Sequence, residues 1–239
     1  MNNEKKQTQN AQDEQTETKK KYDKPLFQNG GIYFHAGCII GKKNVFVTDE
    51  YIDLVVNAIQ SAELKMDIKN LGYVVMPNFF YWMFRLSDKQ SDPTKVYGKV
   101  KMQVAAEILK NLQQEAKEEP YEMCELFKGN DRVNRSPAQK ILWTFEEHAK
   151  EYEGNKRYRV WAPKTGLTLI DSDEKLKQKL EVIRRAPVTD RWQMVARPEQ
   201  YPYLYIADEL LEGAEPKMEA IATFLKKALS SASPAPATA

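Results

Sequence analysis

The sequence predicts an α+β protein with a central antiparallel sheet and helices on one face. Strand-like apolar segments alternate with segments whose apolar residues recur every three or four positions, in the order strand, helix, strand, strand, helix. The two middle strands are separated only by Pro77-Asn78, a pair that favours a turn. Further helices follow, which indicates helices appended to a sheet rather than a repeated strand–helix alternation.

The first half of the chain contains the expected sheet. Residues 30–40 are rich in β-branched and aromatic residues and predict the first strand. Thr48 is a suitable N-cap for a helix over 49–65, whose apolar residues fall on one face. Residues 67–76 and 79–86 then predict an antiparallel pair.

The second half is mainly helical. Residues 94–117 predict a long helix with Asp92-Pro93 at its start, and residues 137–152 predict another. A short strand is expected over 158–162. Later helices are expected over 173–185, with Ser172 as the cap, and over 216–229.

Composition divides the chain into four parts. Residues 1–24 contain no Leu, Ile, Val or Phe, so we expect a disordered arm. A folded domain is expected over 25–212, followed by a C-terminal helical extension over 213–229. Residues 230–239 are small and Pro-rich, which predicts a disordered tail.

The overall composition favours a cytoplasmic protein. Hydrophobic residues make up 42% of the chain, charged residues 29%, and the net charge is +2. No apolar run is long enough to cross a membrane, and no secretory signal is evident. Cys38 and Cys124 are far apart in the chain and are expected to be reduced.

Common catalytic motifs are absent from the sequence. It has no Gly-rich phosphate loop, CxxC pair, HExxH or GxSxG. The only two histidines, His35 and His148, are remote in sequence, and a structural role is expected for both. Local basic runs at 128–140, 155–159 and 184–191 are consistent either with solvated faces or with phosphate binding.

Three segments together resemble one family. They are "GYVVMPN" (residues 72–78), "RVWAP" (159–163) and the closing run "KLEVIRRAPVTDRWQMVARPEQYPYLYIAD" (179–208). Their order and spacing are similar to those of the single-tyrosine HUH transposases, in the branch of REP-associated tyrosine transposases. The resemblance covers residues 31–207 and implies a ferredoxin-like antiparallel sheet and, often, a homodimer.

The resemblance also implies a chemistry. In that family two histidines at positions i and i+2 of the strand after "MPN" bind Mg²⁺ or Mn²⁺, and a tyrosine attacks the scissile phosphate of single-stranded DNA. Folded DNA hairpins are the usual ligands. The family's closing signature reads "KLxYIHxNPV".

Carried over to this chain, the catalytic positions are altered. Phe79 and Tyr81 stand where the metal-binding histidines would be, so no metal or other cofactor is expected. Aligning 101–109 with the family's helix places Gln103 in the nucleophile region, with Tyr97 as a remote candidate. In the closing signature Val182, Arg184 and Ala186 replace Tyr, His and Asn. We therefore expect the former metal pocket to be packed core.

Three functions remain open from the sequence. The first is binding of single-stranded or hairpin DNA without tyrosine nuclease activity. Its expected DNA-binding residues are basic: Lys156, Arg157, Arg159, Arg184, Arg185, Arg191 and Arg197. Bases could also stack on three tyrosines, Tyr201, Tyr203 and Tyr205.

The two other functions depend on different features. One is an active transposase or nuclease with a site rebuilt from Tyr81, Tyr97, His35 and an acid such as Glu107. The other is a protein-interaction scaffold, for which the terminal arm and tail would be docking segments.

Overall fold

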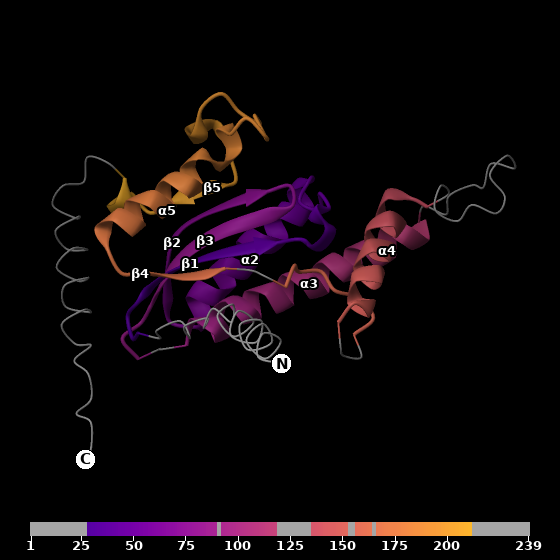
Figure 1. Ribbon diagram of the computed structural model, residues 1–239, viewed down its shortest axis with the longest axis horizontal. Helices are drawn as coiled ribbons and strands as arrows, with labels where there is room; N and C mark the ends of the chain where they lie inside the picture. Colours follow the sequence, from indigo (N-terminus) through magenta and orange to yellow (C-terminus); the bar gives the residue numbers. More distant parts are fainter. Residues whose placement is uncertain (1–27, 90–91, 119–134, 153–155, 164–165, 212–239) are drawn as a thin grey trace, which may run out of the picture.

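The computed structural model describes residues 28–89, 92–118, 135–152, 156–163 and 166–211. Within them, five strands form one antiparallel sheet, and four α-helices surround it (Figure 1). These elements are β1 (Ile32–Cys38), α2 (Asp49–Lys65), β2 (Ile68–Met76), β3 (Phe79–Leu86), α3 (Pro93–Glu118), α4 (Pro137–Lys150), β4 (Leu167–Ile170), α5 (Asp173–Arg185) and β5 (Leu204–Ile206). Short 3₁₀ turns also occur, at Ile40–Lys42, Ala186–Val188, Pro198–Gln200 and Asp208–Leu210.

The sheet has the order β4-β1-β3-β2-β5, and every neighbouring pair is antiparallel. β3 lies between β1 and β2, so the β1-α2-β2 unit is split by the third strand, as in ferredoxin-like folds. The expected α+β class is therefore confirmed. The strands and helices expected in residues 30–117 all form within a few residues of their expected bounds.

Helices cover both faces of the sheet, which corrects the expectation of helices on one face. α2 and α3 pack on the face that carries Phe80, Trp82 and Phe84. α5 packs on the opposite face, where its Leu176 and Ile183 join a second core cluster. Figure 1 shows α5 on one side of the sheet and α2 and α3 on the other. "FFYWMFRL" is apolar on both faces of the strand, and a strand of this kind needs cover on both sides.

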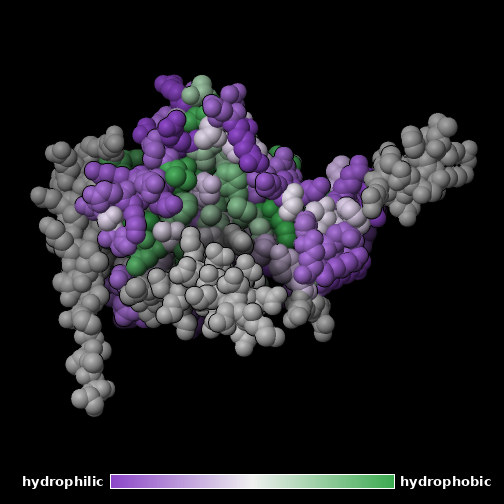
Figure 2. All heavy atoms as spheres, viewed as in Figure 1, coloured by the Kyte–Doolittle hydropathy of each residue, from purple (hydrophilic) through white to green (hydrophobic). Residues whose placement is uncertain are grey.

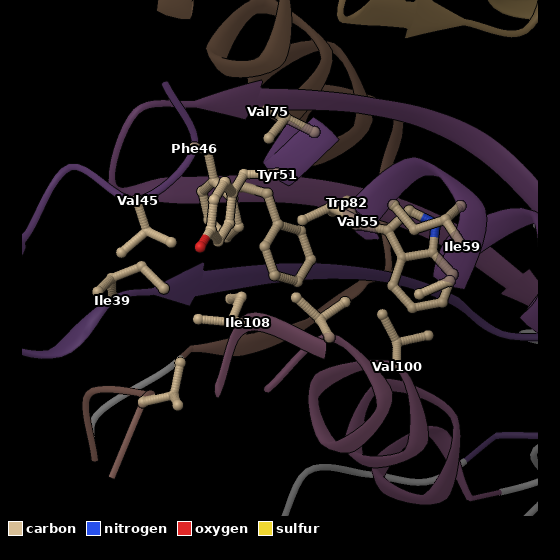
Figure 3. Packing of buried hydrophobic residues seen from close by; sticks show 14 of the residues in the cluster. Ile39, Val45, Phe46, Tyr51, Val55, Ile59, Val75, Trp82, Val100 and Ile108 are labelled. Atoms are coloured by element: carbon tan, nitrogen blue, oxygen red, sulfur yellow. The ribbon is translucent and has the colours of Figure 1, made fainter. Parts of the chain in front are cut away.

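The larger core lies between the sheet and the pair α2 and α3. Figure 3 shows Trp82 of β3 among Val55 and Ile59 of α2 and Val100 of α3. All four side chains are almost completely buried. The indole Nε1 of Trp82 donates to Oδ1 of buried Asn70 at 3.2 Å, which satisfies the polar atom of this ring inside the core.

The closing half of the chain differs most from expectation. Residues 158–162 do not form a strand, and Trp161 makes an isolated bridge with Ile39 instead. β4 and β5 are strands that the sequence pattern did not predict. They have four and three residues, and they form because β1 and β2 offer free edges for pairing.

The predicted terminal segments lie outside the described residues. This applies to the arm over 1–24, the helix over 213–229, the tail over 230–239 and Cys124. In the part of the chain that the structure describes, no helix is long and apolar enough to cross a lipid bilayer.

Gly37 is a position where the fold requires the absence of a side chain. It pairs with Phe80 across β1 and β3, and a Cβ atom at Gly37 would overlap the Phe80 ring. Gly37→Ala is expected to lower the free energy of unfolding by about 1–3 kcal/mol because the core must shift to accept the methyl group.

The matched control for this substitution is Gly98→Ala in α3, where no atom lies within 4 Å of the new Cβ. It is expected to stabilise the protein by about 0.4–1 kcal/mol. Urea unfolding of both variants measures the difference. Equal effects of the two substitutions would contradict the tight packing of Gly37 under Phe80.

Candidate nucleic-acid interface

The turn between β2 and β3 is held in place by the segment that follows β1. The carbonyl of Pro77 accepts hydrogen bonds from the amides of Val45 (2.8 Å) and Phe46 (2.9 Å). The buried Asn78 side chain donates to the carbonyl of Lys42 at 3.2 Å. The "MPN" turn therefore fixes where β3 begins and which way its first side chains point.

Phe79 and Tyr81 project from the same face of β3, because successive strand side chains alternate between faces. Their ring centroids are 4.6 Å apart, and both rings are half-buried. Phe80, between them, is fully buried on the opposite face. The expectation that positions i and i+2 present their side chains together is met by this geometry.

The space above these two rings is a cavity rather than packed core. It has a volume of about 550 Å³ and lies between β3, α5 and the segment after α5. Its lining includes Phe79, Tyr81, Val182, Arg185, Arg191 and Trp192. The prediction that this pocket is packed core was therefore wrong: the aromatic side chains line the pocket without filling it.

The residues present do not fit the Mg²⁺ or Mn²⁺ that the resemblance implies. A phenylalanine has no donor atom for a metal. Burial raises the pKa of the Tyr81 phenol, Cys38 raises it further, and the positive charge of Arg191 only partly opposes them. The phenol is therefore neutral at physiological pH and a poor ligand for hard cations. Across the described residues, no three His, Cys, Asp or Glu side chains are grouped to hold a metal ion.

The structure separates the expected nucleophile region from this pocket. Gln103 and Tyr97 lie on α3, which packs on the other face of the sheet. Gln103 is exposed there, and the Tyr97 ring stacks on His35 at 4.4 Å. The helix that faces Phe79 and Tyr81 is α5, through Val182. Val182 stands at the tyrosine of the family signature "KLxYIHxNPV", and this was the signal in the sequence that could have pointed to α5.

The residues suggested for a rebuilt nuclease site do not lie together in the structure. His35 is fully buried, and neither ring nitrogen makes a well-formed hydrogen bond with the described residues. Burial lowers the pKa of His35 to about 3, with a further contribution from the charge of Lys101, while the backbone of Gly166 opposes the shift. Glu107 pairs with Lys110 at 3.3 Å. Tyr81 lies on the face of the sheet opposite to His35 and Tyr97.

The predicted DNA-binding residues on the α5 side fall into two sets. Arg185 and Arg191 line the cavity. Arg184 instead pairs with Glu199 at 2.9 Å, and Arg197 is exposed in the same segment. Of these four arginines, the two at the cavity are therefore positioned next to the aromatic rings.

The other predicted basic residues lie beside α4. Lys156 is exposed, and Arg157 pairs with Glu146 of α4 at 3.4 Å. The guanidinium of Arg159 lies 3.6 Å from the centre of the Tyr152 ring. The predicted DNA-binding residues therefore lie in two parts of the structure, one beside α4 and one beside α5.

Lys101 of α3 is a further cation, which sequence reasoning did not single out, and its ammonium lies 5.4 Å from the centre of the Trp161 ring. Burial lowers the pKa of Lys101 to about 8, the Cys38 thiol opposes this effect, and the charge of Arg159 adds to it. Cys38, at the end of β1, also acts on the Tyr81 phenol, as Arg191 does.

The three closing tyrosines are less available than expected. Tyr201 is buried, and its hydroxyl donates to the carbonyl of Val75 at 2.7 Å. The Tyr203 hydroxyl donates to the Asp49 carboxylate. Tyr205 is 42% exposed and stacks on Tyr73 at the far edge of the sheet. Because Tyr201 is buried, it does not offer a ring surface on which a base could stack.

The surface view agrees with a mixed apolar and polar interface. Apolar surface gathers at the centre of the molecule, and strongly polar surface borders it (Figure 2). Trp192 is a further cavity residue that the sequence analysis did not single out. Its neighbour Arg191 lies 5.1 Å from the centre of the Trp192 ring.

The fold and the placement of this cavity define an α+β protein with the fold of HUH transposases. A solved structure of a REP-associated tyrosine transposase bound to a REP hairpin is similar to the chain, with a TM-score of 0.50 and 14% sequence identity. The similarity covers 81% of this chain and 87% of the transposase. No protein-family model matches the sequence, and no curated protein matches it either.

Proposed function

We propose that this protein binds single-stranded or hairpin DNA and has lost metal-dependent tyrosine cleavage. One observation is the main support. Phe79 and Tyr81 occupy the two positions where the resembling family has its metal-binding histidines, and they line a cavity bordered by Arg185 and Arg191. On this proposal the protein retains the fold and the arginines that bind phosphate, but it does not bind the metal ion that cleavage requires.

The loss of cleavage follows from two missing components. Cleavage of this type needs a divalent ion to polarise the phosphate and a hydroxyl nucleophile beside it. Phe79 and Tyr81 do not provide the side-chain donor atoms that a divalent metal ion needs. α5 lines the cavity with Gln178, Glu181, Val182 and Arg185, none of which has a hydroxyl group. We propose that Val182, rather than Gln103, stands at the position of the attacking tyrosine.

The retention of DNA binding is supported by the charges around the cavity and by the fold. The similar transposase was solved in complex with a REP hairpin. In this chain, Arg185 and Arg191 provide cations at the cavity. Cations of this kind neutralise backbone phosphates and make binding dependent on salt.

Fluorescence anisotropy with a labelled DNA hairpin that carries a single-stranded extension tests the proposal. Binding is expected to weaken as salt rises and to be the same in EDTA and in Mn²⁺. Denaturing gels after incubation with Mn²⁺ are expected to show no covalent protein–DNA adduct. Binding that requires Mn²⁺, or an adduct, would show that cleavage is retained. Absence of binding at micromolar protein would support the protein-interaction alternative.

The double substitution Arg185→Glu, Arg191→Glu is expected to weaken hairpin binding about tenfold or more. The slope of log K against log salt should become less steep by about two, since two phosphate contacts are lost. Both side chains are exposed, so the fold should be unaffected.

Lys110→Glu is the matched control for this pair. Like Arg185, Lys110 is an exposed helical cation paired with an acid on its own helix, but it lies on α3, away from the cavity. Its substitution should change binding less than twofold. Equal weakening by Lys110→Glu would indicate a general charge effect and would contradict an interface at the cavity.

A further inference from the structure

Three aromatic rings from two separate segments meet at the cavity. Phe79 and Tyr81 come from β3, and Trp192 comes from the segment after α5. The Phe79 and Trp192 ring centroids are 6.0 Å apart, and the Phe79 and Tyr81 centroids are 4.6 Å apart. All three side chains are half-buried, so each has ring surface that the protein does not cover.

The cavity is large enough for a ligand with a flat ring. Its volume of about 550 Å³ falls in the usual range of small-ligand pockets. Aromatic rings bind planar groups by offset stacking or by edge-to-face contacts. The rings in this cavity are tilted against each other by 43° and 58°, so they form a concave wall and not a flat sheet.

Positive charge borders this aromatic wall. The Arg191 guanidinium is next to the Trp192 ring, 5.1 Å from its centre. Arg185 of α5 is 3.7 Å from the Glu181 carboxylate, and both side chains are exposed. Exposed pairs of this length are weak, so Arg185 can exchange Glu181 for a phosphate at little cost. A planar ring linked to an anion matches both features, whereas an apolar peptide side chain would make no use of the two arginines.

We propose that the cavity lined by Phe79, Tyr81 and Trp192 holds one unstacked nucleobase of a bound DNA strand, with the adjoining phosphate against Arg185 and Arg191. This rests on the proposed DNA binding and names the group that the altered site accepts. Base-stacking rings would then occupy the place of the metal ligands in the resembling family. Stacking is tolerant of base identity, because every base has a π face.

Abasic scanning of the single-stranded extension tests this assignment in the full-length protein. Each nucleotide next to the hairpin is replaced in turn by an abasic one, and binding is measured by anisotropy. One position is expected to weaken binding about tenfold, and its neighbours much less, as expected for loss of one base–aromatic stack. Trp192→Leu and, separately, Phe79→Leu should weaken binding to the intact hairpin by a similar factor.

The losses of binding affinity caused by Trp192→Leu and by the abasic nucleotide should not add. On the hairpin that is abasic at the sensitive position, Trp192→Leu should have little further effect, because the stack is already lost. Trp143→Leu is the control, since this half-buried tryptophan lies on α4 and does not line the cavity. It should leave the abasic profile unchanged, and thermal melting checks that all variants are folded.

The outcomes separate the two proposals. If the hairpin binds but no position is sensitive, or the effects of Trp192→Leu and the abasic site simply add, the pocket assignment is overturned while DNA binding stands. Titration with free deoxynucleoside monophosphate, followed by Trp192 fluorescence against the Trp192→Leu variant, tests the pocket independently. Free nucleotide is expected to bind at least tenfold more weakly than the strand. Equal affinity would assign the pocket to a free nucleotide and overturn the assignment to a DNA strand.

Discussion

A chain with both Phe79→His and Tyr81→His is expected to bind Co²⁺ or Zn²⁺ at the cavity under α5. The two side chains already leave β3 on one face, with ring centroids 4.6 Å apart, and the cavity leaves room for a metal ion and its water ligands. Imidazole is a good ligand for these ions. The double variant should bind at least tenfold more tightly than either single variant, because only the pair can chelate.

The visible absorption of Co²⁺ and calorimetric titration of Zn²⁺ measure this effect. The two single variants are the controls, since each adds one imidazole at the same site. Loss of the aromatic contacts should lower stability by no more than a few kcal/mol, because both rings are only half-buried. Equal affinities of the single and double variants would show that the two positions do not share one site.

The His35→Leu variant is expected to be more stable than the original chain, and the gain should grow at acid pH. His35 is completely buried against Tyr97 and Phe80, and its ring nitrogens make no well-formed hydrogen bond with the part of the chain that the structure describes. An apolar side chain of similar size removes this cost, which is about 1–3 kcal/mol at pH 7.

The pH dependence follows from the lowered pKa of His35. The folded chain has a pKa of about 3 at this residue, against an ordinary value of 6.5. Between these values the unfolded chain binds a proton that the folded chain does not, so stability falls as the pH falls through this window. From pH 6.5 to pH 4.5 the loss from His35 alone is about 2–3 kcal/mol. His35→Leu should remove it.

Urea unfolding of the variant and the original chain at pH 7 and pH 4.5 measures both effects. His148→Leu is the matched control, because His148 is the only other histidine and its partly exposed ring contacts Glu151 at 3.1 Å. It should leave the difference between the two pH values close to that of the original chain. If His35→Leu also left this difference unchanged, the acid sensitivity would arise elsewhere.

The sequence predicted well those features that depend on local chemistry. The "MPN" turn, the strand pair around it and the helices over residues 49–65 and 93–118 follow from turn residues and apolar spacing. The same pattern also placed Phe79 and Tyr81 on one face of β3. Each of these conclusions depends on residues within a few positions of one another along the chain.

Other features depended on contacts between remote segments. β4 and β5 are too short to show a pattern, and they are strands only because β1 and β2 accept them as partners. The position of α5 also depends on contacts with segments that are remote in the sequence. Its apolar residues predict a helix but not the face of the sheet that it covers, so the sequence did not show that Val182 of α5 lines the cavity while Gln103 of α3 lies on the other face.

The sequence by itself determined the class of the fold, the turn and the aromatic residues at positions 79 and 81, because these are properties of single residues and of local spacing. Tertiary structure alone decided that the aromatic pair lines an open cavity, that Trp192 and the two arginines border it, and that α3 lies on the far side of the sheet. The physical reason is that an apolar side chain lowers the free energy equally well in a closed core or against a cavity wall, and only the packing of remote segments decides which one forms.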